Sequence, residues 1–136
     1  MSGLYSSALQ SAIYTVLIND GGVINQLGNA IYDSLPTGQV PSLFAHLGEE
    51  TVLDRSDKTA CLRYHDVTIT VVTSAPGFTN AKNAAAAICK ALETTNVSLD
   101  SGKLIRLQFR LAKALRDDNG TERKVNLVFR AVIDEN

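Results

Sequence analysis

The last third of the chain alternates apolar and polar residues with a period of two. The apolar positions of this pattern are Ile105, Leu107, Phe109 and Leu111, and then Val125, Leu127, Phe129, Ala131 and Ile133. A period of two places every second side chain on the same face of a β-strand. The two runs are joined by residues 116–121, and Asn119-Gly120 within them favours a tight turn. The pattern predicts a hairpin of two strands over residues 104–115 and 124–133.

Two further extended segments, residues 43–53 and 61–73, are rich in β-branched and aromatic residues. Thirteen strand residues span about 43 Å, so we expect this second hairpin to protrude from the domain. In residues 61–73 the apolar face changes sides near His65 and Asp66, which a β-bulge or a departure from the core would explain. Residues 31–33 look like one more short strand, ended by Pro36.

Two segments instead show helical spacing of their apolar residues. One carries Leu9, Ile13, Val16 and Leu17, and the other carries Ala81, Ala85, Ile88 and Leu92. Residues 23–27 are expected to add a short turn of helix. The predicted order is helix, three strands, helix, two strands. We therefore expect an α+β fold in one domain, residues 1–136, with two helices packed on one face of a mainly antiparallel sheet.

Composition removes several classes of function. The formal net charge of −1 lacks the excess of Lys and Arg that binding to duplex nucleic acid uses. The apolar runs are too short for a membrane span, and no export signal is recognisable. Cys61 and Cys89 lie in predicted regular structure, so buried free thiols are expected rather than a disulfide.

The sequence shows no catalytic, metal-binding or cofactor-binding motif. Its two histidines, His46 and His65, are interpreted as partly exposed sheet residues rather than ligands or bases. Adjacent strand residues point to opposite faces, so Glu49 and Glu50 do not form an acid and base pair. These observations favour assembly or binding over catalysis. The alternative is an enzyme or small-molecule-binding α+β domain with a pocket around His46 or His65.

Two surfaces are candidates for contacts with another subunit or a partner protein, and both have a plainer interpretation. On the outer face of the last strand, opposite its core residues, either a helix of the same chain or another subunit covers the apolar positions. The tip of the protruding hairpin is either simply solvated or contacts a partner, and a projecting tip of mixed charge suits a subunit interface better than a ligand pocket. The outer-face residues are Val128, Arg130 and Val132, and the tip residues are Asp54, Arg55, Asp57 and Lys58.

Taken in order, several features resemble one family of proteins. They are Ile31-Tyr32-Asp33 before Pro36, Leu47-Gly48-Glu49-Glu50 with Asp54 and Ser56, Gly77, an Ala-rich helix with Ile88 and Leu92, the turn Arg116 to Thr121, and Leu127-Val128-Phe129-Arg130-Ala131. This order resembles the tail terminator, or tail completion, family of small tail proteins encoded by long-tailed phages, prophages and gene transfer agents. The resemblance covers nearly the whole chain.

The resemblance implies a structural virion protein without enzymatic activity, assembled in the host bacterial cytoplasm. In the family, six copies close into a ring on the tail tube, stop its polymerisation and provide the surface for joining the head. The implied partners are further copies of the chain, the tail tube protein, and a head completion or neck protein. DNA would pass through the lumen without sequence-specific binding, and our candidates for an acidic lining are Glu49, Glu50, Asp117 and Asp118. An adaptor of the neck or tail with another copy number is the alternative.

Overall fold

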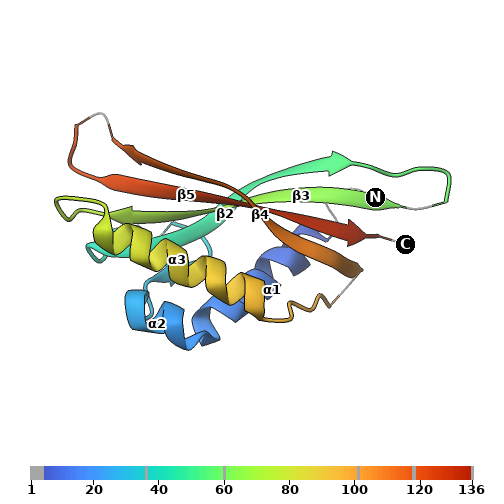
Figure 1. Ribbon diagram of the computed structural model, residues 1–136, viewed down its shortest axis with the longest axis horizontal. Helices are drawn as coiled ribbons and strands as arrows, with labels where there is room; N and C mark the ends of the chain where they lie inside the picture. The colour runs from blue at the N-terminus through green and yellow to red at the C-terminus, as the bar shows by residue number, and fades with distance from the viewer. Residues whose placement is uncertain (1–4, 36, 60, 101, 118, 136) are drawn as a thin grey trace.

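The computed structural model describes residues 5–35, 37–59, 61–100, 102–117 and 119–135 (Figure 1). Within these residues the chain forms three helices and a five-stranded sheet, with the helices on one face of the sheet. In chain order the elements are α1 (Ser6–Asn19), α2 (Gly21–Leu27), β1 (Ile31–Tyr32), β2 (Leu43–Asp54), β3 (Leu62–Thr73), α3 (Thr79–Thr94), β4 (Lys103–Arg116) and β5 (Arg123–Asp134). None of the helices in this part of the chain is long and apolar enough to cross a membrane.

The predicted α+β fold is confirmed, with one helix more than the two we expected. The extra element is α2, where the sequence indicated only a turn of helix. Asp20 ends α1 and begins α2, because its Oδ2 accepts a hydrogen bond from the backbone N–H of Val23 (3.0 Å). Gly28 then ends α2 with φ of 61°, a conformation that glycine adopts without strain.

The strands follow the spatial order β1-β2-β3-β5-β4. Every pair is antiparallel except β1 with β2, which is parallel and pairs only two residues of each strand. The β2–β3 and β4–β5 hairpins extend past the helices at opposite ends of the molecule (Figure 1). The predicted protrusion of the first hairpin is therefore confirmed, and the second hairpin protrudes as well.

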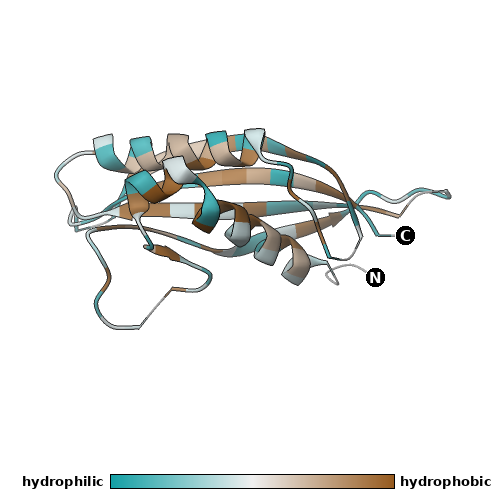
Figure 2. Cartoon of the chain, turned by 90° about the horizontal axis from the view of Figure 1, so that it is seen from below, coloured by the Kyte–Doolittle hydropathy of each residue, from teal (hydrophilic) through white to brown (hydrophobic). Residues whose placement is uncertain are grey.

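The core lies between the sheet and the helices, which cross the sheet as Figure 2 shows from the helix side. The helix-facing residues of β5 are all buried, as the alternating pattern predicts: Val125, Leu127, Phe129, Ala131 and Ile133. The stripes on α1 and α3 meet them with Leu9, Ile13 and Leu17, and with Ala81, Ala84, Ala85, Ile88, Ala91 and Leu92. Because most of the α3 stripe is alanine, this helix can lie close to the sheet.

The alternation does not continue through β4, where our expectation of one shared apolar face is wrong. Register shifts against β5 occur between Leu104 and Arg106 and between Phe109 and Leu111. Before the second shift, Phe109 is opposite Phe129 on the helix side, whereas after it Leu111 is opposite Val128 on the outer side. An extra residue in one strand moves all following side chains to the other face.

The change of face expected near His65 and Asp66 is not a bulge in β3. This strand pairs with β5 without interruption from Leu62 to Thr73. The helix-facing side simply becomes polar, because Arg63 and His65 occupy buried positions on it. The irregularity lies instead in β2, between His46 and Glu49.

Candidate assembly surfaces

The tip of the β2–β3 hairpin is exposed and held by its own hydrogen bonds. The backbone N–H of Ser56 donates to Asp54 Oδ1, and that of Thr59 donates to Asp57 Oδ1, both at 2.8 Å. The hydrogen bonds from Ser56 hold the pKa of Asp54 below its ordinary value of 3.8. Short acidic side chains that bind the backbone two residues on are typical of ordered turns. The tip is therefore an ordered surface of mixed charge, with Arg55 and Lys58 exposed on it.

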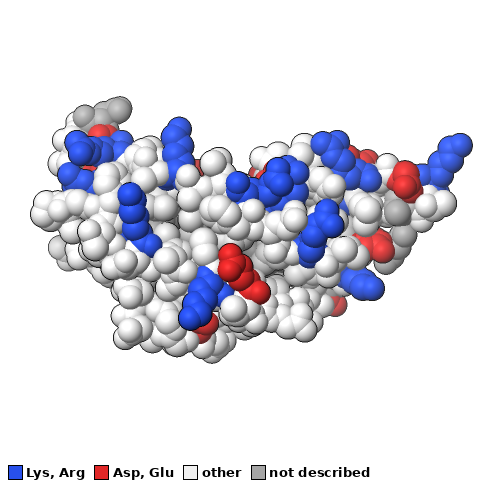
Figure 3. Space-filling model, in the orientation of Figure 1, with Lys and Arg blue, Asp and Glu red and all other residues white. Residues whose placement is uncertain are grey.

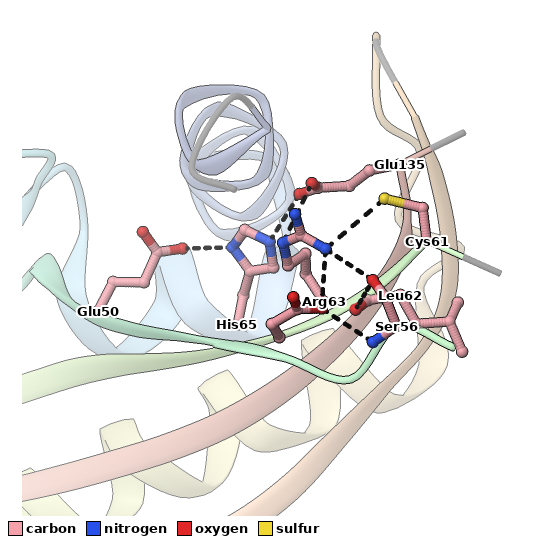
Figure 4. Close-up of polar contacts among 8 residues, drawn as sticks. Glu50, Ser56, Cys61, Leu62, Arg63, His65 and Glu135 are labelled. Atoms are coloured by element: carbon pink, nitrogen blue, oxygen red, sulfur yellow. Dashed lines mark hydrogen bonds and ion pairs between the residues drawn. The ribbon is translucent and has the colours of Figure 1, made fainter. Parts of the chain in front are cut away.

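Arg63 joins this tip to the body of the molecule. Its Nη1 donates to Asp54 Oδ1 (3.0 Å) and to Ser56 Oγ (2.8 Å), and its Nε lies 3.6 Å from Glu135 Oε1 (Figure 4). The Arg63 side chain is 11% exposed and that of Glu135 is fully buried. Glu135 also ties the end of β5 to the hairpin, because its backbone N–H donates to the carbonyl of Cys61 (2.8 Å).

His65 completes this cluster and is fully buried. Its Nδ1 lies 3.0 Å from Glu50 Oε2 and its Nε2 lies 3.4 Å from Glu135 Oε2, with the two carboxylates on opposite sides of the ring (Figure 4). Burial alone would raise the pKa of Glu50, but hydrogen bonds from His65 and Ser6 hold it below its ordinary value of 4.5. Both ring nitrogens contact carboxylates of the same chain, and the buried ring is not open to a ligand.

The alternative of a ligand pocket at the histidines therefore gains no support at His65. Our interpretation of His65 as a partly exposed residue is also wrong, because the residue is buried between two carboxylates. His46 is half-buried, with its ring 6.2 Å from that of Phe44. The described residues contain no group of three or more His, Cys, Asp or Glu side chains arranged to hold a metal ion. Cys61 and Cys89 are free and half-buried.

The outer face of the sheet carries Arg130, which binds Asp66 through two hydrogen bonds of 2.8 and 2.9 Å. The guanidinium also lies 4.8 Å from the centre of the Tyr64 ring. Hydrogen bonding to Arg130 lowers the pKa of Asp66, and the same contact raises that of Arg130. Such paired hydrogen bonds fix the plane of the guanidinium along the surface.

The apolar outer-face residues Val128 and Val132 are not covered by a helix of the same chain, since all helices of the described residues lie on the other face (Figure 1). Val132 is nevertheless only 3% exposed, between its cross-strand neighbours Tyr64 and Arg106. Val128 is half-buried beside Leu111. Contact of this surface with another subunit stays a prediction.

The open edge of the sheet at β4 is a surface that the sequence analysis missed. Three of its apolar side chains are largely exposed, Ile105 at 46%, Phe109 at 44% and Leu111 at 54%. The strand also carries five basic residues and no acidic one: Lys103, Arg106, Arg110, Lys113 and Arg116. Figure 3 shows Lys and Arg side chains spread along the face it presents, with a few Asp and Glu side chains among them. The sequence did contain one signal of this surface, because residues 103–116 include no Asp or Glu. The exposure of the apolar side chains could not be read from the sequence, since it depends on the bulges that break the alternation of β4.

The four candidate lumen residues lie in different surroundings. Glu49 is exposed and is opposite Thr68, and Asp117, in the turn after β4, is half-buried and accepts a hydrogen bond from Thr121 Oγ1 (2.9 Å). Glu50 points to the helix side, where it contacts His65. Asp118 lies outside the described residues. Among the described residues of this set, Glu49 is the one that is exposed to solvent.

Comparison with known proteins agrees with this architecture. A family model described as Tail completion protein gp17 matches residues 11–134. One chain in the virion of a native gene transfer agent (GTA) particle has the same fold, with a TM-score of 0.91 and 41% sequence identity, over 98% of this chain and 99% of that chain. No curated protein sequence matches the chain significantly. The chain belongs to the tail completion protein gp17 family and is a structural protein of the phage-tail type.

Proposed function

We propose that this protein forms a hexameric ring that caps the tail tube, stops its polymerisation and provides the surface on which the head is joined. The observation that carries the proposal is the likeness to a chain of a GTA virion over nearly the full length of both chains. At 41% identity and a TM-score of 0.91 the two proteins share their fold. The same role in the particle is the simplest reading of that likeness.

The shape of the molecule supports a position between two partners. Its two hairpins project at opposite ends, so each end offers an extended surface (Figure 1). We assign the tip with Asp54, Arg55, Asp57 and Lys58 to the contact with the tube protein or with a neighbouring subunit. Interface rims are typically polar and solvent-accessible in this way. The head completion or neck protein would then meet the other end.

The outer face of the sheet is the proposed lining of the channel or part of a subunit contact. Arg130 is already neutralised by Asp66, so it is a weak attractor for a phosphate backbone. Exposed Glu49 would repel phosphate and let DNA pass without adhesion. Catalysis plays no part in this proposal, because its steps are polymerisation control and docking.

The first test is the molar mass of the purified protein, by light scattering coupled to size exclusion over a concentration series. The expected species has a mass of about 88 kDa, six times the 14.6 kDa of one chain, and appears as a closed ring in electron micrographs. Adding it to polymerising tube protein should shorten the tubes and leave a ring at one end. A protein that stays monomeric at high concentration and also fails to limit tube length would contradict the proposal. A ring of another size would favour the adaptor alternative.

A further inference from the structure

The two sides of the sheet present open strand edges of opposite charge. On one side, β4 is the last strand and carries five basic residues and no acidic one. On the other side, β1 pairs with β2 only at Ala45 and His46, and no described strand pairs with residues 49–54 there. β2 carries three acidic residues and no Lys or Arg: Glu49, Glu50 and Asp54. Glu50 already contacts His65 and Asp54 already pairs with Arg63, so in the described residues Glu49 is the exposed carboxylate of this edge that forms no ion pair.

The middle of the basic edge is not neutralised by the described residues. In the described residues, Arg106, Arg110 and Lys113 form no ion pair, and all three are exposed. Arg110 is near enough to the outer face to lower the pKa of Asp66, although that carboxylate already binds Arg130. Beside these cations, Ile105, Phe109 and Leu111 remain exposed. Long edges that carry apolar side chains bind or aggregate unless a partner covers them.

The cross-strand register also shows that the two edges lie at the same position along the strand direction. Paired residues across β2, β3, β5 and β4 form one row through Glu49, Thr68, Val128 and Leu111, and another through Asp54, Arg63, Ile133 and Leu104. The free stretch of β2 is therefore level with residues 104–111 of β4. β2 and β4 also run in opposite directions, since three antiparallel pairings separate them.

We infer that β4 of one copy pairs antiparallel with the free stretch of β2 of the next copy, so that the sheet continues from subunit to subunit. This rests on the proposed function, since it specifies how the ring is held together. Each copy then contributes one basic and one acidic edge to two different contacts. Such a head-to-tail contact closes into a ring when its rotation permits.

The charge pattern also selects this pairing against its alternatives. Two β4 edges would bring ten cations together, and two β2 edges would bring the Glu49 carboxylates of both copies together with no cation of β2 to offset them. Like charges that face each other across an interface repel, which disfavours both symmetric dimers. The two bulges of β4 further disfavour pairing of two identical flat edges. Only the β4–β2 contact joins opposite charges.

Disulfide cross-linking tests the pairing directly. The key variant replaces Thr51 and Gln108 by Cys, in a background with Cys61→Ser and Cys89→Ser. Thr51 and Gln108 are exposed and belong to the same row, through Asp66 and Arg130, so neighbouring copies would place them within disulfide reach. The register between the two copies can differ by two residues, because every second side chain of a strand lies on the same face. Gln108→Cys is therefore also combined with Glu49→Cys and with Leu53→Cys. The control pairs Gln108→Cys with Thr15→Cys, an exposed position on α1.

After mild oxidation, a non-reducing gel should show covalent multimers for at least one of the three test pairs and none for the control. Ring mass is measured on the same samples under reducing conditions. A ring of the expected mass without cross-links in any test pair would overturn the β4–β2 contact and leave the proposed function standing. If no ring forms for the unmodified protein or the variants, both the contact and the ring proposal fail.

Charge exchange provides a second measurement that does not depend on disulfide geometry. Arg106→Glu with Arg110→Glu should weaken ring assembly at low salt by about tenfold or more. Adding Glu49→Lys and Thr51→Lys should restore the ring, because the opposite charges then face each other in exchanged positions. The β4 variant folds as before if its circular dichroism is unchanged. Loss of the ring without any rescue by the β2 exchange would contradict the contact.

Discussion

The helix-facing side of the sheet has two buried halves that are built from different chemistry. Under the helices it is apolar, with Ile69, Leu127 and Phe129 almost inaccessible to solvent. At the base of the β2–β3 hairpin it is ionic, with His65 and Glu135 equally inaccessible. Apolar packing stabilises in proportion to the area buried and has no direction, whereas each buried polar group needs a partner in one place. The first half supplies stability, and the second fixes the position of the hairpin.

The ionic half also contains buried polar atoms that lack hydrogen-bond partners among the described residues. Arg63 Nε and Glu135 Oε1 are 3.6 Å apart, and neither atom has a hydrogen-bond partner among the described residues. A buried ion pair adds little net stability because both charges lose their hydration, yet removing one partner leaves the other charge unpaired. Substitutions in the two halves should therefore have different signatures.

The largest effect is expected in the apolar half. Phe129→Ala should lower the free energy of unfolding by about 3–5 kcal/mol, because it leaves a cavity beneath the helices. The control is Phe109→Ala, which removes the edge-to-face partner ring at 5.8 Å from a position that is 44% exposed. Its loss should be about 1 kcal/mol. Urea unfolding of the two variants measures both, and equal losses would show that the core does not centre on Phe129.

In the ionic half, Arg63→Met should lower the free energy of unfolding by about 3 kcal/mol, because Glu135 then keeps a buried charge without its partner. Adding Glu135→Gln should recover part of this loss, since the remaining group is neutral. A double-mutant cycle by urea unfolding measures the coupling. Additive losses would mean that the two side chains do not act as a pair. Glu135→Gln should not recover any of the stability lost in Phe129→Ala.

Acid should destabilise the ionic half specifically. The pKa of Glu50 is lower in the folded protein than its ordinary value of 4.5, so this carboxylate stabilises the fold at neutral pH. That stabilisation is fully present above pH 4.5 and is lost as the pH falls through the lowered pKa. Glu50→Gln should therefore make the free energy of unfolding depend less steeply on pH between pH 5 and pH 3. The expected decrease in slope is that of one titrating carboxyl group. An unchanged slope in the variant would contradict the contact with His65.

The smallest effect is expected on the outer face, which serves as the exposed counterpart of the buried cluster. Asp66→Asn removes one partner of an ion pair whose two side chains are each 22% exposed. The loss should be about 0.5–1 kcal/mol and should shrink at high salt. Thermal unfolding at low and high salt measures it. A loss as large as that of Arg63→Met would show that the outer face is less accessible to solvent than the structure places it.

Local patterns predicted most of the strands correctly. The alternation of Val125, Leu127 and Phe129 is visible in the sequence because β5 pairs without interruption with β3 and buries one face. The same reasoning gave a wrong face for Leu111, since two bulges break the alternation of β4. A bulge inserts a residue without changing the composition of the strand, so alternation alone does not reveal it.

The candidate surfaces were predicted less well than the fold. The exposed tip with Arg55 and Lys58 was recognisable from its run of charged residues between two strands. The open edge with Ile105 and Phe109 was not, because apolar residues in a strand are ordinarily interpreted as core. Which strand ends a sheet depends on pairing between distant segments, and β4 lies at the edge because β5 inserts between it and β3.

By itself the sequence determined the type of each long element, the antiparallel hairpins and the resemblance to a family of tail proteins. These follow from periodicity and turn residues, which act between neighbours in the chain. Only the tertiary structure decided that His65 is enclosed by Glu50 and Glu135, and that a basic and an acidic strand edge lie on opposite sides of one sheet. The enclosing carboxylates come from segments 15 and 70 residues away from His65. Contacts over such separations are set by how the strands pair and the helices pack, which local patterns do not encode.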